Sequence, residues 1–235
     1  MKASPNRKSG FYLTLMLFCN LMLGCGQVDN ANIPLSAETW RSLFDGETLL
    51  GWTGLNGATI GDGWEVVDSN LVLTAGGAGD LVTLDTFRDF ELQLEWKISV
   101  KGNSGILYRV ANGDQPVWMS GMEYQVLDHE AYPGLVNSSR TAGAVFDLYA
   151  PSAEVVNPVG QFNQTRIRVE GNNVEHWLNG HKIISYTLWS DDWTVRFDNS
   201  KFATYKDFGR IRQGHIALQD HGDQVSYRNI RIKEL

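Results

Sequence analysis

The chain has 235 residues and a formal net charge of −7 at pH 7, and it is rich in aromatic residues, including eight Trp. Nucleic-acid binding needs clustered Lys and Arg, so this acidic balance argues against nucleic acid and suits a neutral ligand. The two cysteines are Cys19 and Cys25. Since Cys19 lies in a segment that we expect to be removed, no disulfide is expected within the mature chain.

Residues 1–24 have the features of a signal peptide. Three cations, Lys2, Arg7 and Lys8, come before a mostly apolar run of 13 residues, Phe11 to Leu23. This run is too short to span a bilayer as a helix but fits a signal-peptide core. Removal of the three cations takes the net charge from −7 to −10.

The apolar run ends in Met22-Leu23-Gly24-Cys25, which resembles a lipoprotein cleavage site. Met22 and Leu23 depart from the usual residues of that pattern. We predict lipidation of Cys25 and a polar tether over residues 25–39, with a plain secreted protein as the alternative. Gly26 after the cysteine favours the outer membrane, by resemblance to other bacterial lipoproteins. The expected location is therefore an outer-membrane or periplasmic lipoprotein, in contact with the membrane through its lipid.

From Trp40 onward, short β-type runs alternate with glycine turns. Phe90 to Ile98 alternates strictly, with apolar residues at the even positions, and Asn179-Gly180 is typical of a two-residue hairpin turn. Asp191 to Phe208 is expected to hold at most a short helix. This pattern predicts one all-β domain over residues 40–235, a sandwich or a barrel. Further strands are predicted at 64–67, 71–74, 81–84, 165–170, 173–178, 181–185 and 225–232.

The stretch from Gly214 to Gly222 carries an unusual strand pattern. Ile216 and Leu218 share one parity, whereas His215, Gln219 and His221 share the other. Amide and imidazole side chains two residues apart point the same way and together can hold a polar ligand. The alternative is that Gln219 and His221 are ordinary surface residues.

Two earlier stretches extend this parity argument. Arg109 shares a face with Gly105 and Leu107, and Glu123 shares a face with Gln125. If the three faces coincide, one surface gathers Arg109, Glu123, Gln125, Gln219 and His221. Such a set needs many hydrogen-bond partners, which favours a binding site. Three more residues lie close in the sequence and could bind hydroxyl groups: Asn103, Tyr108 and Asp220.

A metal site stays open. Glu123, His176 and His221 are plausible ligand types for a divalent ion, but no tight ligand spacing links them. His176 could equally be a histidine that packs between strands. Asp128-His129-Glu130 is dense in ligand types but is more typical of a solvated loop. No phosphate-binding or dinucleotide fingerprint occurs.

Several motifs resemble those of one bacterial family. They are Leu43-Phe44-Asp45-Gly46, Gly51-Trp52, the runs Asn103 to Arg109 and Gly121 to Asp128, His176 to Gly180, and Gln219 to Gly222. The family is named for 3-keto-disaccharide hydrolases, also described as 3-keto-glucoside 1,2-lyases and 3-keto-2-hydroxyglucal hydratases. Phe162-Asn163 departs from the usual Trp-Asn of relatives. The resemblance implies a two-sheet jelly roll of the concanavalin-lectin kind, with the ligand on a concave sheet.

The resemblance also implies a reaction. The substrate would be a glucoside already oxidised to a ketone at carbon 3, which acidifies the proton on carbon 2. A base removes this proton, the aglycone leaves from carbon 1, and water then adds. Glu123 or His221 could be the base, and Arg109, a histidine such as His176 or a metal could stabilise the enolate.

Two other functions stay open. A non-catalytic carbohydrate-binding module on the same fold would use exposed aromatic side chains such as Trp118, Trp189 and Trp193. A structural surface lipoprotein would have no coherent polar face.

Overall fold

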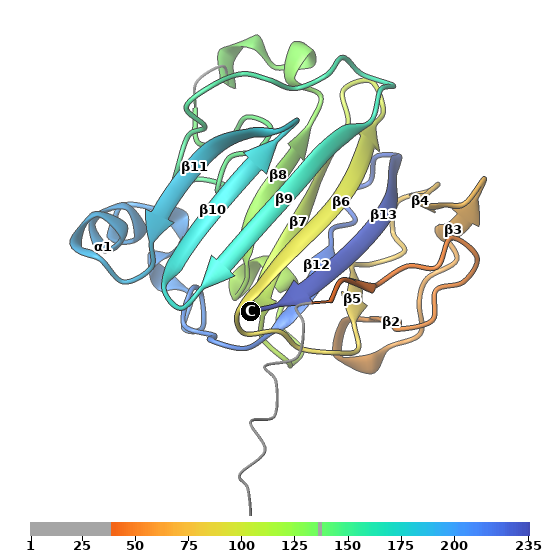
Figure 1. The fold of residues 1–235 in the computed structure, drawn as a ribbon, viewed down its shortest axis with the longest axis horizontal. Coiled ribbons are helices and arrows are strands. Elements are labelled where there is room, and N and C mark those ends of the chain that lie inside the picture. The colour runs from red at the N-terminus through yellow and green to blue at the C-terminus, as the bar shows by residue number, and fades with distance from the viewer. Residues whose placement is uncertain (1–38, 136–137) are drawn as a thin grey trace, which may run out of the picture. The chain divides into compact units, whose positions relative to one another are not determined.

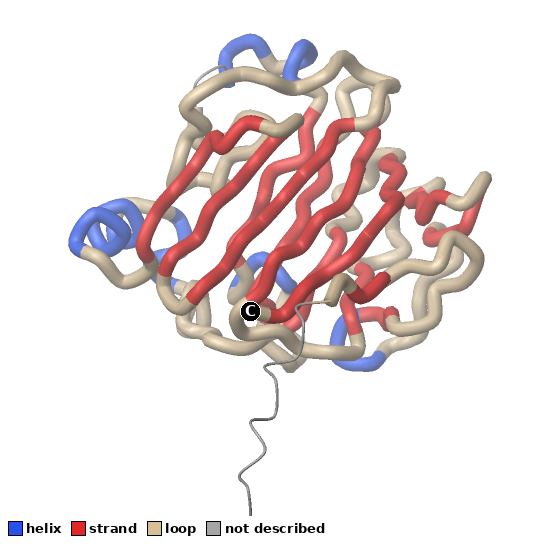
Figure 2. Tube along the Cα trace, in the orientation of Figure 1, coloured by secondary structure: helices blue, strands red, loops and turns tan. Residues whose placement is uncertain are grey.

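The computed structural model describes residues 39–135 and 138–235, which form one compact all-β sandwich of two antiparallel sheets (Figures 1 and 2). This confirms the predicted fold class, a concanavalin-lectin-like jelly roll. The predicted signal peptide, the lipidation site at Cys25 and the tether as far as residue 38 lie outside the described residues. Among the described residues, no helix is long and apolar enough to cross a membrane.

The larger sheet has eight strands and faces the viewer in Figure 1. Its order is β11-β10-β9-β6-β13-β4-β3, with β1 paired to β13. The bounds are β1 (Arg41–Ser42), β3 (Trp64–Val67), β4 (Asn70–Leu73), β6 (Phe90–Ile98), β9 (Asn163–Glu170), β10 (Asn173–Leu178), β11 (His181–Thr187) and β13 (Val225–Glu234).

The smaller sheet has five strands in the order β2-β5-β12-β7-β8, and it lies behind the larger sheet in Figure 1. Its strands are β2 (Trp52–Gly54), β5 (Leu81–Thr83), β7 (Asn103–Val110), β8 (Met122–Leu127) and β12 (His215–Leu218).

The strictly alternating run Phe90 to Ile98 forms a central strand of the larger sheet. β6 has the predicted bounds, pairs with β9 and β13, and buries Phe90, Leu92 and Trp96. Asn179 and Gly180 have φ of 48° and 82°, as a type I′ turn requires, and they join β10 to β11.

Helix is sparse, as predicted. The α-helix α1 (Asp191–Asp198) starts at Ser190, whose Oγ accepts a hydrogen bond from Trp193 N at 3.2 Å. Trp193 and Phe197 stack on each other and are buried. Short 3₁₀ turns are η1 (Leu55–Gly57), η2 (Val117–Met119), η3 (His129–Ala131), η4 (Pro133–Leu135) and η5 (Lys201–Thr204).

The main hydrophobic core lies between the sheets. The five-stranded sheet contributes Ile106, Tyr124 and Leu218 to it. The opposite face of the same sheet, which we call the outer face, carries a separate small cluster that contains Val82, Leu107, Val110, Val117 and Ala217. Because part of the outer face is also buried, polar residues on it lie in a partly dehydrated environment.

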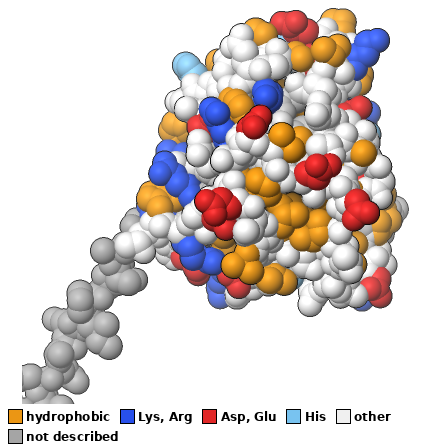
Figure 3. Space-filling view, turned by 90° about the vertical axis from the view of Figure 1, so that its right-hand side faces the viewer, with side chains coloured by type: hydrophobic (Ala, Val, Ile, Leu, Met, Phe, Trp, Pro, Cys, Tyr) orange, Lys and Arg blue, Asp and Glu red, His pale blue; other side chains and the backbone are white. Residues whose placement is uncertain are grey.

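Charge is scattered over the surface that Figure 3 shows, the side at the right of Figure 1. Acidic and basic side chains alternate there with apolar ones, and no continuous basic patch appears on this face.

Candidate functional site

Two neighbouring strands place carboxyl and amide groups on the outer face. In the antiparallel β7–β8 pair, Gly105 lies opposite Gln125 and Leu107 lies opposite Glu123. Leu107 belongs to the small apolar group on the outer face. Paired residues on neighbouring strands share a face, so Glu123 projects on the same side as Leu107, and so does Gln125, two residues further along β8. Gly105 has no side chain and leaves a gap between them.

Strand β12 brings a third polar group to this gap. Ala217 pairs with Leu107, and the backbone N–H of Gln219 donates to Gly105 O at 2.9 Å. Gln219, Gly105 and Gln125 therefore form one row across three strands, and the middle residue of the row has no side chain of its own.

Strand β5 adds an acid that the sequence did not single out. β5 pairs Val82 with Ala217 and Leu81 with Leu218, so one further step of this register places Asp80 beside Gln219. Asp80 has the parity of Val82 and so faces the outer side. In the sequence it merely ends a glycine-rich loop, and only the strand pairing reveals its position. We call Asp80, Asn103, Glu123, Gln125 and Gln219 the outer-face cluster.

Glu123 leans over the gap at Gly105. A Cβ atom at Gly105 would lie 2.8 Å from both Cγ and Oε1 of Glu123. The Glu123 side chain is 8% exposed, and no hydrogen bond to its carboxyl group occurs within residues 39–135 and 138–235. Burial raises the pKa of Glu123 from 4.5 to about 8, although the charge of Lys201 opposes the shift and that of Asp80 adds to it. At neutral pH this carboxyl group is mostly protonated and can donate a proton.

Two buried amide oxygens on the outer face find no hydrogen-bond partner among the residues that the structure describes. Gln125 is 1% exposed and Gln219 is 7% exposed, and Oε1 of each is unpaired. The Gln125 Nε2 donates to Asn103 Oδ1 at 2.9 Å, which fixes the orientation of that amide. An unpaired buried acceptor destabilises a protein by about 1–3 kcal/mol, so two of them beside the gap fit the hydroxyl groups of a ligand.

Asp80 is held in place by the loop that follows β12. Its Oδ1 accepts from Asp220 N at 2.9 Å. Burial raises the pKa of Asp80 from 3.8 to about 6; the hydrogen bond from Asp220 N and the charge of His221 oppose this shift, and the charge of Asp220 adds to it. At neutral pH, Asp80 is mostly ionised while Glu123 is mostly neutral.

Arg109 does not join the outer-face cluster, so the predicted common face is wrong for this residue. The β7–β12 register changes between His215 and Ala217, which lie opposite Val110 and Leu107, so β7 has one extra residue. Arg109 lies in this bulge with φ of 54°. Its Nη2 donates to Gly171 O at 2.8 Å and lies 3.7 Å from Asp89 Oδ1, near the β9–β10 turn.

Tyr108 and His176 lie between the sheets, so their predicted place beside Glu123 is also wrong. His176 is fully buried; its Nδ1 donates to Gly143 O at 3.0 Å and its Nε2 accepts from Tyr108 O–H at 2.9 Å. Tyr186 O–H lies 2.9 Å from the Tyr108 oxygen. Burial lowers the pKa of His176 to about 4, so the imidazole is neutral at physiological pH. The group has the partners of a structural histidine.

Asp220 and His221 follow β12 in a loop. Both carboxylate oxygens of Asp220 accept backbone N–H groups, from Gly79 at 2.9 Å and from Gly222 at 2.9 Å. Asp220 therefore ties the two loops together rather than presenting free oxygens to a substrate. His221 is exposed, and its charge acts on Asp80, so it lies at the edge of the outer-face cluster.

The three suggested metal ligands do not meet, because His176 lies in the core whereas Glu123 and His221 lie on the outer side. In the described ranges, no group of three or more His, Cys, Asp or Glu side chains converges on a metal position. Asp128 is 4% exposed and accepts from Lys101 N at 2.6 Å, which corrects its assignment to a solvated loop.

Lys201 is a further residue that the sequence did not single out. Its charge acts on Glu123, and its ammonium lies 4.4 Å from the centre of the Phe146 ring and 5.9 Å from that of Trp118. Trp118 packs against the apolar part of the outer face. Trp193, in contrast, is buried and cannot be an exposed sugar platform.

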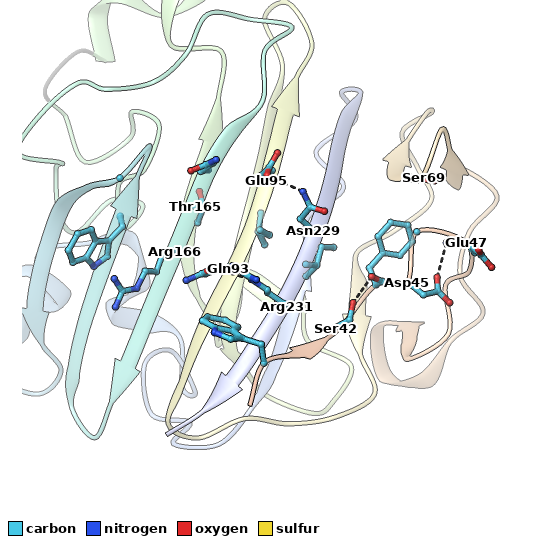
Figure 4. A pocket seen from close by; sticks show the side chains of 18 residues that line it. Ser42, Asp45, Glu47, Ser69, Gln93, Glu95, Thr165, Arg166, Asn229 and Arg231 are labelled. Carbon is cyan, nitrogen blue, oxygen red and sulfur yellow. Dashed lines mark hydrogen bonds between the residues drawn. The ribbon is translucent and has the colours of Figure 1, made fainter. Parts of the chain in front are cut away.

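A groove of about 910 Å³ lies on the opposite side of the molecule, over the eight-stranded sheet (Figure 4). Its polar side chains bind one another: Arg231 Nη2 donates to Gln93 Oε1 at 2.7 Å, and Asn229 Nδ2 donates to Glu95 Oε1 at 3.0 Å. The unpaired amide oxygens and the acid with the raised pKa are on the outer face of the five-stranded sheet. We therefore place the candidate site there rather than in the groove.

Comparison with known proteins identifies the family. The model of the 3-keto-alpha-glucoside-1,2-lyase-like domain matches residues 39–233. The chain belongs to this family. A 3-keto-disaccharide hydrolase of Bacteroides thetaiotaomicron is 31% identical over 91% of this chain and 84% of its own length. Membership of the 3-keto-alpha-glucoside-1,2-lyase-like family makes the protein a carbohydrate-active enzyme.

Solved structures support the same assignment. A "putative glycosyl hydrolase" of Parabacteroides distasonis has a TM-score of 0.78 and 34% identity, over 83% of this chain and 94% of its own. The carbohydrate-binding module CBM66 of Bacillus subtilis has a TM-score of 0.50 and 13% identity, over 78% of this chain and 96% of its own, and it shares the fold alone. The two-sheet scaffold thus occurs with and without enzymatic chemistry.

Substitution of Gly105 by Ala should disable the site while the protein stays folded. The added Cβ would lie 2.8 Å from Glu123 Cγ and Oε1, so the Glu123 side chain must move. We expect turnover to fall by about tenfold to a hundredfold, because small displacements of a reacting group have effects of this size. Steady-state kinetics together with the melting temperature test this; full activity with an unchanged melting temperature would contradict it.

The raised pKa of Glu123 predicts a pH-dependent effect on stability. The folded protein keeps a proton that the unfolded chain releases above pH 4.5, so this contribution is complete below pH 4.5 and is lost as the pH rises towards 8. Glu123→Gln stays neutral, so it should match the wild type near pH 4.5 and exceed it at pH 8.5 by about 2–4 kcal/mol. Urea unfolding at both pH values measures this, and equal differences at the two would contradict it.

Proposed function

We propose that this protein cleaves 3-keto-glycosides by removing the proton on carbon 2, eliminating the aglycone from carbon 1 and adding water to the product. The relative named 3-keto-disaccharide hydrolase and the family description suggest the substrate class. The observation that carries the proposal is the position of Glu123, a buried, unpaired and mostly protonated acid over the gap at Gly105.

The chemistry needs few protein groups. The ketone at carbon 3 acidifies the neighbouring C2–H bond, so the enzyme must supply a base, a proton donor for the leaving oxygen and a partner for the enolate. This elimination differs from the direct displacement of an ordinary glycosidase, which uses a pair of carboxyl groups flanking the glycosidic bond. The unpaired oxygens of Gln125 and Gln219 can accept hydroxyl groups of the sugar.

Glu123 fits the proton donor better than the base that the sequence suggested. With a pKa of about 8, it carries the proton that the leaving oxygen needs at neutral pH. Lys201, whose charge acts on Glu123, can stabilise the enolate in place of Arg109, which lies away from the outer-face cluster. A second, ionised group must then take the proton from carbon 2.

The test is incubation of the purified protein with a 3-keto-glucoside, with and without a chelator, while release of the aglycone is measured. Release should require the ketone, so the unoxidised glucoside is the control. A rate equal to that in buffer would contradict the proposal. Loss of activity with the chelator would show that a metal ion takes part.

A non-catalytic carbohydrate-binding module is the alternative function. It would bind sugars through aromatic platforms and would not need Glu123. The burial of Trp193 and the stacking of Arg212 over Trp189, at 4.4 Å from its ring centre, leave these rings less available for such a role. Sugar binding without turnover of any 3-keto-glycoside would favour the module.

A further inference from the structure

The position of Asp80 is the starting point. It lies one step beyond the pairing of Leu81 with Leu218, so it extends the row of Gln219, Gly105 and Gln125 across a fourth strand. Gln219 stands between Asp80 and Gly105 in this row, and Glu123 reaches over Gly105 from the other side. The two carboxyl groups are close enough for the charge of Asp80 to act on Glu123. A sugar ring bound over this row would lie between two carboxyl groups.

The carboxylate of Asp80 is held in place through one of its oxygens, and the other oxygen is available to a substrate. Its Oδ1 accepts from Asp220 N at 2.9 Å, and Asp220 Oδ2 in turn accepts from Gly79 N at 2.9 Å. These two bonds clamp the loop before β5 to the loop after β12. Close contact of Gly76 with Gly222 adds to this clamp, since a Cβ on Gly76 would lie 2.6 Å from Gly222 Cα. The Asp80 Oδ2 accepts no hydrogen bond from any residue that the structure describes.

We infer that Asp80 is the second catalytic carboxyl group, the base that removes the proton from carbon 2 while Glu123 protonates the leaving oxygen. The inference rests on the proposed function. In the elimination, the C2–H bond breaks and its proton passes to Asp80. The electron pair forms the C1=C2 bond through the enolate, and the C1–O bond breaks with the proton of Glu123 going to the leaving oxygen.

Hydration restores both groups. Water adds to carbon 1 and gives a proton to the Glu123 carboxylate, while Asp80 returns its proton to carbon 2. The net change is the consumption of one water molecule, with no oxidant or reductant.

The charges around Asp80 suit this role. Burial and the neighbouring Asp220 carboxylate disfavour its ionised form, while the Asp220 backbone N–H and the charge of His221 favour it. The resulting pKa of about 6 leaves Asp80 ionised at neutral pH and basic enough to take a proton, opposite a neutral Glu123.

The experiment compares four proteins in D₂O with one 3-keto-glucoside: wild type, Asp80→Asn, Glu123→Gln and Asp85→Asn. Asp85 is the matched control, because it is an exposed carboxylate just beyond β5 that pairs with Arg41. Deuterium incorporation at carbon 2, followed by NMR, reports proton removal, and aglycone release reports the full elimination.

Asp80→Asn keeps an oxygen for Asp220 N–H, so it should stay folded. It should lose both exchange and release by about a hundredfold or more. Glu123→Gln should lose release but keep exchange, and Asp85→Asn should keep both. Exchange by Asp80→Asn within threefold of the wild type would overturn the inference and leave the proposed function standing. A wild type that neither exchanges nor releases would overturn both.

The wild type alone offers a second test, independent of whether Asp80→Asn folds. Its kcat/KM should fall as the pH is lowered through about 6, where Asp80 becomes protonated. A profile that is flat between pH 5 and 7 would overturn the assignment of Asp80.

Discussion

Replacement of Glu123 by Gln should lower the turnover of a 3-keto-glucoside by about a hundredfold or more, the usual effect of removing a general acid or base. Gln has the same shape as the protonated acid and fits the same place over Gly105, so substrate affinity should change little. The loss should therefore appear in kcat rather than in KM. Steady-state kinetics on protein with an unchanged circular dichroism spectrum measures both constants.

Glu95→Gln is the matched control for this experiment. Glu95 lies on the outer side of the eight-stranded sheet, in the groove of Figure 4, where it pairs with Arg228 at 2.7 Å. If the site is on the five-stranded sheet, Glu95→Gln keeps its activity. Loss of activity in Glu95→Gln with full activity in Glu123→Gln would move the site to the opposite sheet.

The sequence was a good guide where the signal is local. The alternation of β6 and the turn at Asn179-Gly180 depend on neighbouring residues, and both were predicted correctly. The common face of Glu123, Gln125 and Gln219 follows from alternation in two regular strands.

The errors come from what alternation cannot report. Arg109 has the parity of Leu107, but one extra residue in β7 turns it away, and no residue type in that run marks the bulge. Asp80 lies at the site because β5 pairs with β12, which is more than 130 residues away in the chain. Tyr108 has the opposite parity to Leu107, so alternation alone would turn it to the core; its closeness in sequence to the site residues suggested a binding role. His176 was open between packing and the site, and the structure places it in the core with Tyr108.

His176 supplies the second large effect, on stability rather than on turnover. The side chain is fully buried, and it links Gly143 O to Tyr108 O–H by hydrogen bonds of 3.0 and 2.9 Å. His176→Ala would leave a cavity and two unpaired polar groups, so we expect the free energy of unfolding to fall by about 3 kcal/mol or more. Urea unfolding measures this, with the exposed His181→Ala, expected within about 0.5 kcal/mol of the wild type, as the control.

A double-mutant cycle identifies the source of that loss. Tyr108→Phe removes the hydroxyl that donates to His176 Nε2, so the two substitutions should be non-additive by about 1 kcal/mol. The same variants separate a structural histidine from a catalytic one. If His176 acts only through the core, the folded fraction of His176→Ala turns over substrate at nearly the wild-type rate well below its melting temperature. If His176→Ala instead has normal stability but no turnover, His176 takes part in the reaction. Its removal would then have left the core intact, so it could not be the link between the two sheets.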